Sequence, residues 1–153
     1  MTESEKNFYM ELAYKEAEKA FELDEVPIGA IIVKDGEVIA RAYNLKEREN
    51  CALYHAETVA IREACRRVGN WWLEDCDLFV TLEPCSMCVG ACINSRLRGV
   101  YFGAYDKKAG CMGSVVDLSA KGLFNHNLFV EGGINAEKCG KILSDFFAGK
   151  RKK

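Results

Sequence analysis

The spacing of apolar positions divides the chain into alternating predicted helices and strands. Ala13, Ala17, Ala20 and Phe21 recur at helical spacing, which predicts a first helix from about Ser4 to Leu23. Thr2 and Glu5, just before and inside this segment, have the spacing of a capping box, which favours a helix start there.

An apolar, β-branched run from Ile28 to Val33 predicts the first strand. Asp35-Gly36 is a two-residue hairpin signal, because both residues tolerate the positive φ angles of the turn. The segment from Glu37 to Ala42 then returns as the second strand, so the pattern predicts a β-hairpin directly after the first helix.

The remaining segments continue the alternation of helix and strand. The pattern predicts a helix over 55–68 closed by Gly69, a strand over 77–82, a short helix over 86–95, a strand over 100–103, a weaker helix over 116–122, a strand over 128–131, and a last helix capped by Asn135 that runs to Ala148, with Gly149 just past its end. A hairpin followed by alternating elements indicates an α/β fold with one mixed sheet of five strands between two helical layers.

Length and composition are those of an ordinary globular protein. The 153 residues, 49% of them hydrophobic and 29% charged, fit a single α/β/α domain over 1–153 and exclude a wholly disordered chain. No apolar run approaches the roughly 20 residues of a membrane helix, and the polar N-terminus does not resemble a signal peptide. We therefore expect a cytoplasmic protein. The net charge of −2 excludes a strongly basic coat, whereas a local basic patch would suffice for nucleic acid.

Cysteine is unusually frequent and histidine is rare. The eight cysteines include one C-x-x-C pair, Cys85 and Cys88, and the two histidines are His55 and His126. Without a signal peptide these cysteines are expected to be reduced, and a close pair then suggests a metal site. A metal site with a histidine ligand would therefore have to use one of these two residues.

Two short motifs carry the candidate chemistry: His55-Ala56-Glu57 at one predicted helix start, and Pro84-Cys85-Ser86-Met87-Cys88 at another. Alone, the first is common by chance, and the second also fits a redox pair or half of a structural zinc site. In this order, H-x-E followed by P-C-x-x-C is the signature of zinc deaminases.

The chemistry requires these residue types at this spacing. Cysteines at i and i+3 share one helix face, His55 would supply a third ligand to one Zn²⁺ per chain, and the fourth position would stay open for water. Glu57 would act as general acid and base, moving the proton of that water to the substrate ring and the leaving amine. Its simpler reading is a first-turn glutamate that complements the helix dipole.

Nearly the whole chain resembles the bacterial tRNA adenosine deaminases of the cytidine deaminase superfamily. The resemblance rests on the two motifs and on Glu25–Ala30, Asn44, Phe79–Cys85, Ser95-Arg96, Phe102–Ala104, Asp106, Gly110, Gly113-Ser114, Asn125-His126 and Leu143–Phe147. It implies a cytidine deaminase-like fold, a homodimer, and conversion of the wobble adenosine in a tRNA anticodon stem-loop to inosine.

The same resemblance implies the residues that contact substrate. These are Asn44 toward the base or ribose, Val26, Pro27 and Ala56 along the base pocket, Asp106 toward the flanking nucleotide, and Phe147 with the basic tail 150–153 on the RNA side. Several of these also have an ordinary explanation: Asn44 could be a turn residue at a strand end, Asp106 could be a solvated acid beside Lys107, and a basic tail is often only solvated.

One segment departs from the family. Cys51-Ala52-Leu53-Tyr54 replaces the usual Asp-(Pro or Ala)-Thr-Ala before the histidine, where substrate would approach. Three functions therefore remain open: an RNA adenosine deaminase, a zinc deaminase of a free base, nucleoside or nucleotide such as guanine or cytidine, and an RNA-binding module with a structural zinc. The last would need a fourth protein ligand, such as Cys51, Cys65, Cys76 or Cys111.

Overall fold

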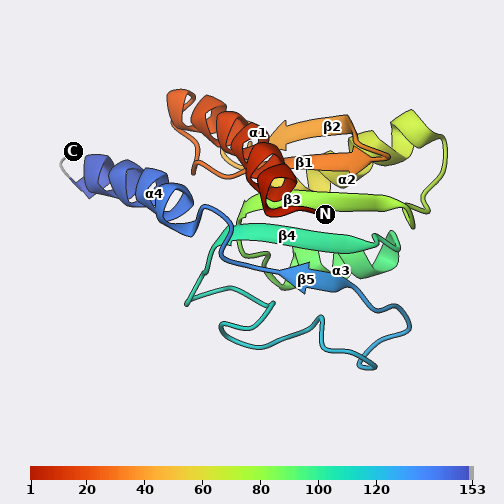
Figure 1. Cartoon of the computed structure of the whole chain (residues 1–153). Coiled ribbons are helices and arrows are strands. Elements are labelled where there is room, and N and C mark those ends of the chain that lie inside the picture. The colour runs from red at the N-terminus through yellow and green to blue at the C-terminus, as the bar shows by residue number, and fades with distance from the viewer. Residues whose placement is uncertain (152–153) are drawn as a thin grey trace.

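A five-stranded sheet forms the centre of the computed structural model, which describes residues 1–151 (Figure 1). Its spatial order is β2-β1-β3-β4-β5, with β1 (Gly29–Lys34), β2 (Glu37–Tyr43), β3 (Cys76–Leu82), β4 (Gly99–Ala104) and β5 (Phe129–Glu131). Strand β1 pairs antiparallel with β2 and β3, whereas β3, β4 and β5 run parallel. The predicted mixed sheet is confirmed.

Helices cover both faces of this sheet. The helices are α1 (Glu3–Glu22), α2 (Ala56–Val68), α3 (Ser86–Asn94) and α4 (Ala136–Arg151). Helices α2 and α3 pack on one face, in a core cluster with Ile32 and Val80, while α1 and the start of α4 pack on the other, with Ile31 and Phe79. Neighbouring strand residues thus belong to opposite cores, which explains why the central strands are apolar at successive positions.

Several local sequence signals form the predicted structures. Thr2 and Glu5 make the reciprocal capping box of α1, and Gly69 ends α2 with a left-handed φ of 80°. Asp35 and Gly36 have φ angles of 50° and 76°, as the tight turn of the β1–β2 hairpin requires. These signals are local, so the sequence alone is sufficient to predict them.

Two predictions of helix extent are wrong. Residues 116–122 form turns rather than a helix, because Asp117 pairs with Met112 in an isolated β-bridge and its carboxylate accepts the Ser119 N–H at 3.0 Å. Gly149 does not end α4, which continues to Arg151, and Lys150 in its last turn lies 2.5 Å from the Asp24 carboxylate. Lys152 and Lys153 of the basic tail lie outside the described residues.

The long segment between β4 and β5 leaves the sheet at the end where β3 and β4 finish and returns along the β5 side to the opposite end, where the parallel strand β5 begins (Figure 1). Helices α2 and α3 begin at the end of the sheet where β3 finishes. Strands β2 and β3 both run antiparallel to β1 and therefore finish at this end, and α2 follows β2 in the chain as α3 follows β3. In residues 1–151, no helix combines the length and the apolar character needed to cross a membrane.

Candidate active site

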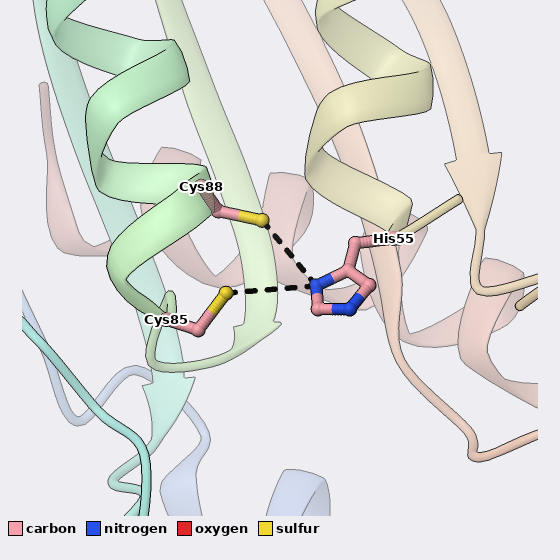
Figure 2. A group of neighbouring side chains, drawn as sticks. All are labelled: His55, Cys85 and Cys88. Atoms are coloured by element: carbon pink, nitrogen blue, oxygen red, sulfur yellow. Dashed lines mark hydrogen bonds between the residues drawn. The ribbon is translucent and has the colours of Figure 1, made fainter. Parts of the chain in front are cut away.

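His55 and Cys85 are the residues that precede α2 and α3. Both have extended backbone, with φ, ψ of −80°, 155° and −78°, 178°, and neither side chain caps its own helix. The two side chains are therefore free to point toward each other across the gap between the helix starts (Figure 2). The positive ends of both helix dipoles face the same point, where they favour thiolate over thiol.

The side chains of His55, Cys85 and Cys88 converge on one point. Nδ1 of His55 lies 3.6 Å from Sγ of Cys85 and 3.5 Å from Sγ of Cys88, and the three ligand atoms all lie within 4.8 Å of one another (Figure 2). A tetrahedral zinc site with bonds of about 2.0–2.3 Å holds its ligand atoms about 3.3–3.8 Å apart. The spacing and the N/S₂ donor set therefore fit a zinc ion, with Nδ1 as the imidazole ligand.

This candidate metal-binding group offers three protein ligands, His55, Cys85 and Cys88. Within residues 1–151 none of the other cysteines belongs to it, including Cys51, Cys65, Cys76 and Cys111, which a closed structural site could have recruited. Three protein ligands with an open fourth position are typical of a catalytic zinc site.

Each thiol of the group shifts the pKa of the other. The pKa of Cys85 falls to about 4, first because the Cys88 thiol donates a hydrogen bond to it, and further because His55 and the Cys88 N–H stabilise the thiolate against burial. The pKa of Cys88 is raised, since its proton is held in that hydrogen bond and the thiol is buried. The hydrogen bond to Cys85 likewise raises the pKa of His55. Such a cluster favours a bound cation, which would replace these protons.

Glu57 lies in the first turn of α2, next to the metal-binding group, and is 4% exposed. Burial raises the pKa of its carboxyl to about 7, although the backbone N–H, the charge on His55 and the Cys88 thiol favour the ionised form. A carboxyl that titrates near neutral pH can both take and give a proton, as a general acid–base group must.

A cavity of about 650 Å³ opens beside His55. It lies at the carboxyl ends of β3 and β4, represented by Leu82 and Ala104, and its outer wall is α4. Besides His55, the cavity is lined by five of the residues that the family resemblance implied: Val26, Asn44, Ala56, Asp106 and Phe147.

These residues differ in how free their side chains are. Asn44 is buried and makes two hydrogen bonds of 3.3 Å, from its amide to the Val26 carbonyl and from the Lys46 N–H to its oxygen. Asp106 accepts the backbone N–H groups of Lys108 and Ala109 at 3.0 and 3.2 Å. Phe147 is 44% exposed. Pro27 is buried between Val26 and Ile28 in sequence, which line the cavity, but does not line it itself.

Sequence reasoning missed two groups of residues around the cavity. Lys46, Lys107 and Lys108 line it, although nothing in the sequence indicates that segments so far apart meet. Two buried carboxylates hold its walls: Glu25 accepts the N–H groups of Glu47 and Arg48 at 3.1 and 2.7 Å, and Glu83 binds the 106–114 segment. Glu25 and Glu83 both lie in motifs that the chain shares with the family, and this was the one sign in the sequence that they have a structural role.

Comparison with known proteins gives a consistent relationship. A family described as MafB19-like deaminase matches residues 4–151. A tRNA-specific adenosine deaminase of Bacillus subtilis is 51% identical over 153 residues, which is 100% of this chain and 94% of that protein.

Solved structures agree in fold. One, from studies of A-to-I editing by tRNA deaminases at the wobble position, has a TM-score of 0.85 at 43% identity and covers 89% of this chain and 99% of its own. A guanine deaminase from Bacillus subtilis is 37% identical with a TM-score of 0.61, but covers only 64% of this chain and 63% of its own.

Proposed function

The chain belongs to the MafB19-like deaminase family and is a homologue of tRNA-specific adenosine deaminases, and from this premise we propose that it converts adenosine to inosine at the wobble position of a tRNA anticodon. The reaction consumes one water and releases ammonia. All of residues 1–153 would form one catalytic domain, and a tRNA substrate would place the activity in the cytoplasm.

His55, Cys85 and Cys88 would hold one Zn²⁺ per chain, as their spacing and donor chemistry support. When bound, zinc would supply the reaction with a water of lowered pKa. Zinc binding would also stabilise the fold, because its ligands lie at the starts of two different helices that the ion would hold together.

Glu57 would carry the proton through the reaction. Its carboxylate would take a proton from the attacking water and give it to N1 of the adenine ring. It would then take the second proton, from the hydroxyl group newly bonded to C6, and pass it to the departing amino group. The burial that raises its pKa to about 7 supports both halves of this cycle, because neither protonation state is then strongly favoured near neutral pH.

The cavity would hold the adenosine after it has turned out of its stack. Val26, Ala56 and buried Pro27 would shape the space for the base, and Asn44 would bind the base or ribose through its amide. Asp106 and the half-exposed ring of Phe147 lie farther out, where neighbouring nucleotides of a loop would contact them. RNA is read most often in such single-stranded loops, whose bases can be splayed out.

The lysines of the cavity favour RNA over a free base. Lys46, Lys107 and Lys108 are all exposed, and none takes part in an ion pair recorded among residues 1–151. These three cations outnumber the carboxylate of Asp106 in the same lining and therefore suit phosphates, which a free base lacks. This basic mouth, formed by Lys46, Lys107 and Lys108, is the main observation that favours RNA as the substrate. The exposed Leu53 of the unusual 51–54 segment would give a flanking base an apolar contact.

The protein would form a homodimer through the outer side of α3. The outer side of α3 has a shallow hollow of about 240 Å³, lined in part by Gly90, Ile93 and Phe124. Exposed apolar side chains gather in the adjoining segment: Val115, Val116, Leu123 and Phe124. Small residues on a helix allow a second copy to approach closely. Sedimentation at micromolar concentration should give twice the mass of one chain, and a single-chain species would contradict the dimer.

Incubation with two substrate sets tests the function. Purified protein should form inosine in total tRNA and release no ammonia from a panel of guanine, cytosine, adenosine and cytidine. Binding to an anticodon stem-loop should weaken steeply with added salt, because phosphate contacts release counterions. Ammonia from guanine or cytidine, with tRNA unchanged, would instead establish the free-base deaminase.

A further inference from the structure

Glu83 lies close in sequence to the metal-binding group but is not among the residues that line the cavity. It follows Leu82, the last residue of β3, and stands two positions before Cys85. Only 2% of the residue is exposed. A buried carboxylate is costly unless its oxygens are satisfied, so its bonding partners indicate its role.

Both oxygens of Glu83 are occupied by one distant segment. Oε1 accepts the Asp106 N–H at 3.0 Å and the Ser114 hydroxyl. Oε2 accepts the N–H groups of Met112 and Ser114 at 2.9 and 3.0 Å. The segment from Asp106 to Ser114 is thus folded around one carboxylate, more than twenty residues away in sequence.

The segment also approaches Glu83 too closely to admit a larger residue. A Cβ atom added at Gly110 would lie 2.3 Å from Cδ of Glu83 and 2.5 Å from the Asp106 carbonyl oxygen. Two backbone hydrogen bonds of 2.9 Å reinforce the contact, from Glu83 N–H to the Ala104 carbonyl and from Cys111 N–H to the Pro84 carbonyl.

The segment held in this way carries part of the cavity wall. Tyr105, Asp106, Lys107 and Lys108 all line the cavity. We propose that Glu83 is a positioning residue for substrate binding, which fixes this wall at a set distance from Cys85 and the metal-binding group. The inference rests on the proposed function for the identity of the substrate, but the anchoring itself does not depend on it.

A carboxylate is the side chain that these donors require. Four donors converge on two oxygens, and a carboxylate is acceptor-only. Gln has the same shape but one acceptor oxygen; its amide NH₂ would face two of the donors, which would leave buried N–H groups unsatisfied. Glu83→Gln should therefore release the segment without removing volume or any metal ligand.

Steady-state kinetics on an anticodon stem-loop with a wobble adenosine test this role. Glu83→Gln should raise KM on the order of tenfold while kcat and metal content stay near wild type. The matched control is Asp117→Asn, which removes an exposed carboxylate that accepts from Ser119 on the same long segment but away from the cavity. The control should behave as wild type.

Limited trypsin digestion provides a readout that needs no substrate. Lys107 and Lys108 are exposed, so cleavage there should accelerate in Glu83→Gln and not in Asp117→Asn. Should Glu83→Gln fail to fold, Gly110→Ala displaces the segment from the other side and should show the same rise in KM and in cleavage.

The outcomes separate the two proposals. Loss of metal or of kcat at unchanged KM in Glu83→Gln would overturn the positioning role, and so would wild-type KM with wild-type cleavage. If wild type makes no inosine in the stem-loop, the proposed function fails, while trypsin cleavage still decides whether Glu83 anchors the segment.

Discussion

His55 and Cys85 hold equivalent positions at the starts of two helices, and Nδ1 of the first lies 3.6 Å from Sγ of the second. The two helices come from segments thirty residues apart in sequence, so this contact joins them only in the folded chain. Cys88, one turn into α3, adds a third ligand atom 3.5 Å from the same nitrogen.

Removal of one ligand should abolish metal binding. His55→Ala leaves two thiols, which cannot form the N/S₂ set, so the metal content should fall from about one zinc per chain to nearly none, and the melting temperature should fall with it. Elemental analysis and thermal unfolding measure both. Cys65→Ala changes a half-buried cysteine outside the group and should keep its zinc; equal metal in His55→Ala would show that the ligands are misassigned.

The basic mouth of the cavity should govern affinity for RNA. Lys107→Ala with Lys108→Ala should raise KM for the stem-loop several-fold at low salt and reduce the slope of log K against log salt by about 2. Lys15→Ala, an exposed lysine on α1, is the control and should leave the slope alone. An unchanged slope in the double variant would mean that phosphates do not lie against this mouth.

Tight packing between α1 and β1 should make Gly29 irreplaceable. A Cβ there would lie 2.1 Å from the Ala13 carbonyl oxygen and 2.4 Å from the Ala17 nitrogen, both backbone atoms that move only with the whole helix. Gly29→Ala should therefore lower the free energy of unfolding by about 3 kcal/mol in denaturant titrations. Gly149→Ala, with open space around it inside α4, should be neutral or slightly stabilising.

Local signals explain which parts of this molecule the sequence predicts. The capping box at Thr2, the Asp35-Gly36 turn and the stop at Gly69 depend on neighbouring residues only, and all three form. The helix predicted over 116–122 does not form, because the Asp117 side chain stabilises a turn through the Ser119 N–H and its backbone pairs with Met112.

The candidate site likewise has a part that the sequence predicts and a part that it does not. The metal-binding group follows from two motifs, because helix starts and i, i+3 spacing fix the ligand directions. The buried roles of Glu25 and Glu83 do not follow, since each accepts backbone N–H groups from segments more than twenty residues away. Sequence patterns treat a Glu as a surface residue until tertiary structure supplies such donors.

Alkaline pH should weaken the fold through its buried thiols. Burial raises the pKa of Cys139 to about 12, whereas an unfolded thiol ionises near pH 8.5. The folded chain keeps this proton longer than the unfolded chain does, so the contribution is complete below about pH 8.5 and is lost as pH rises toward 12.

Comparison of variants isolates this effect from the titration of lysine and tyrosine. Between about pH 9 and 11, Cys139→Ala should lose stability less steeply than wild type, by up to ~1.4 kcal/mol per pH unit. Cys51→Ala, a half-exposed position, should keep the wild-type slope. Denaturant titrations at several pH values measure the slopes, and parallel curves for Cys139→Ala and wild type would contradict the account.

Inosine formation by wild type and Glu57→Gln, with zinc measured in the same samples, tests the central claim most directly. The substrate is an anticodon stem-loop with adenosine at the wobble position, and the product is identified by nuclease digestion and mass spectrometry. Wild type should convert that adenosine to inosine with about one zinc per chain, and Glu57→Gln should hold the same zinc with turnover reduced at least ~100-fold. Wild-type turnover in Glu57→Gln, or a wild-type protein that deaminates guanine and leaves the stem-loop unchanged, would contradict it.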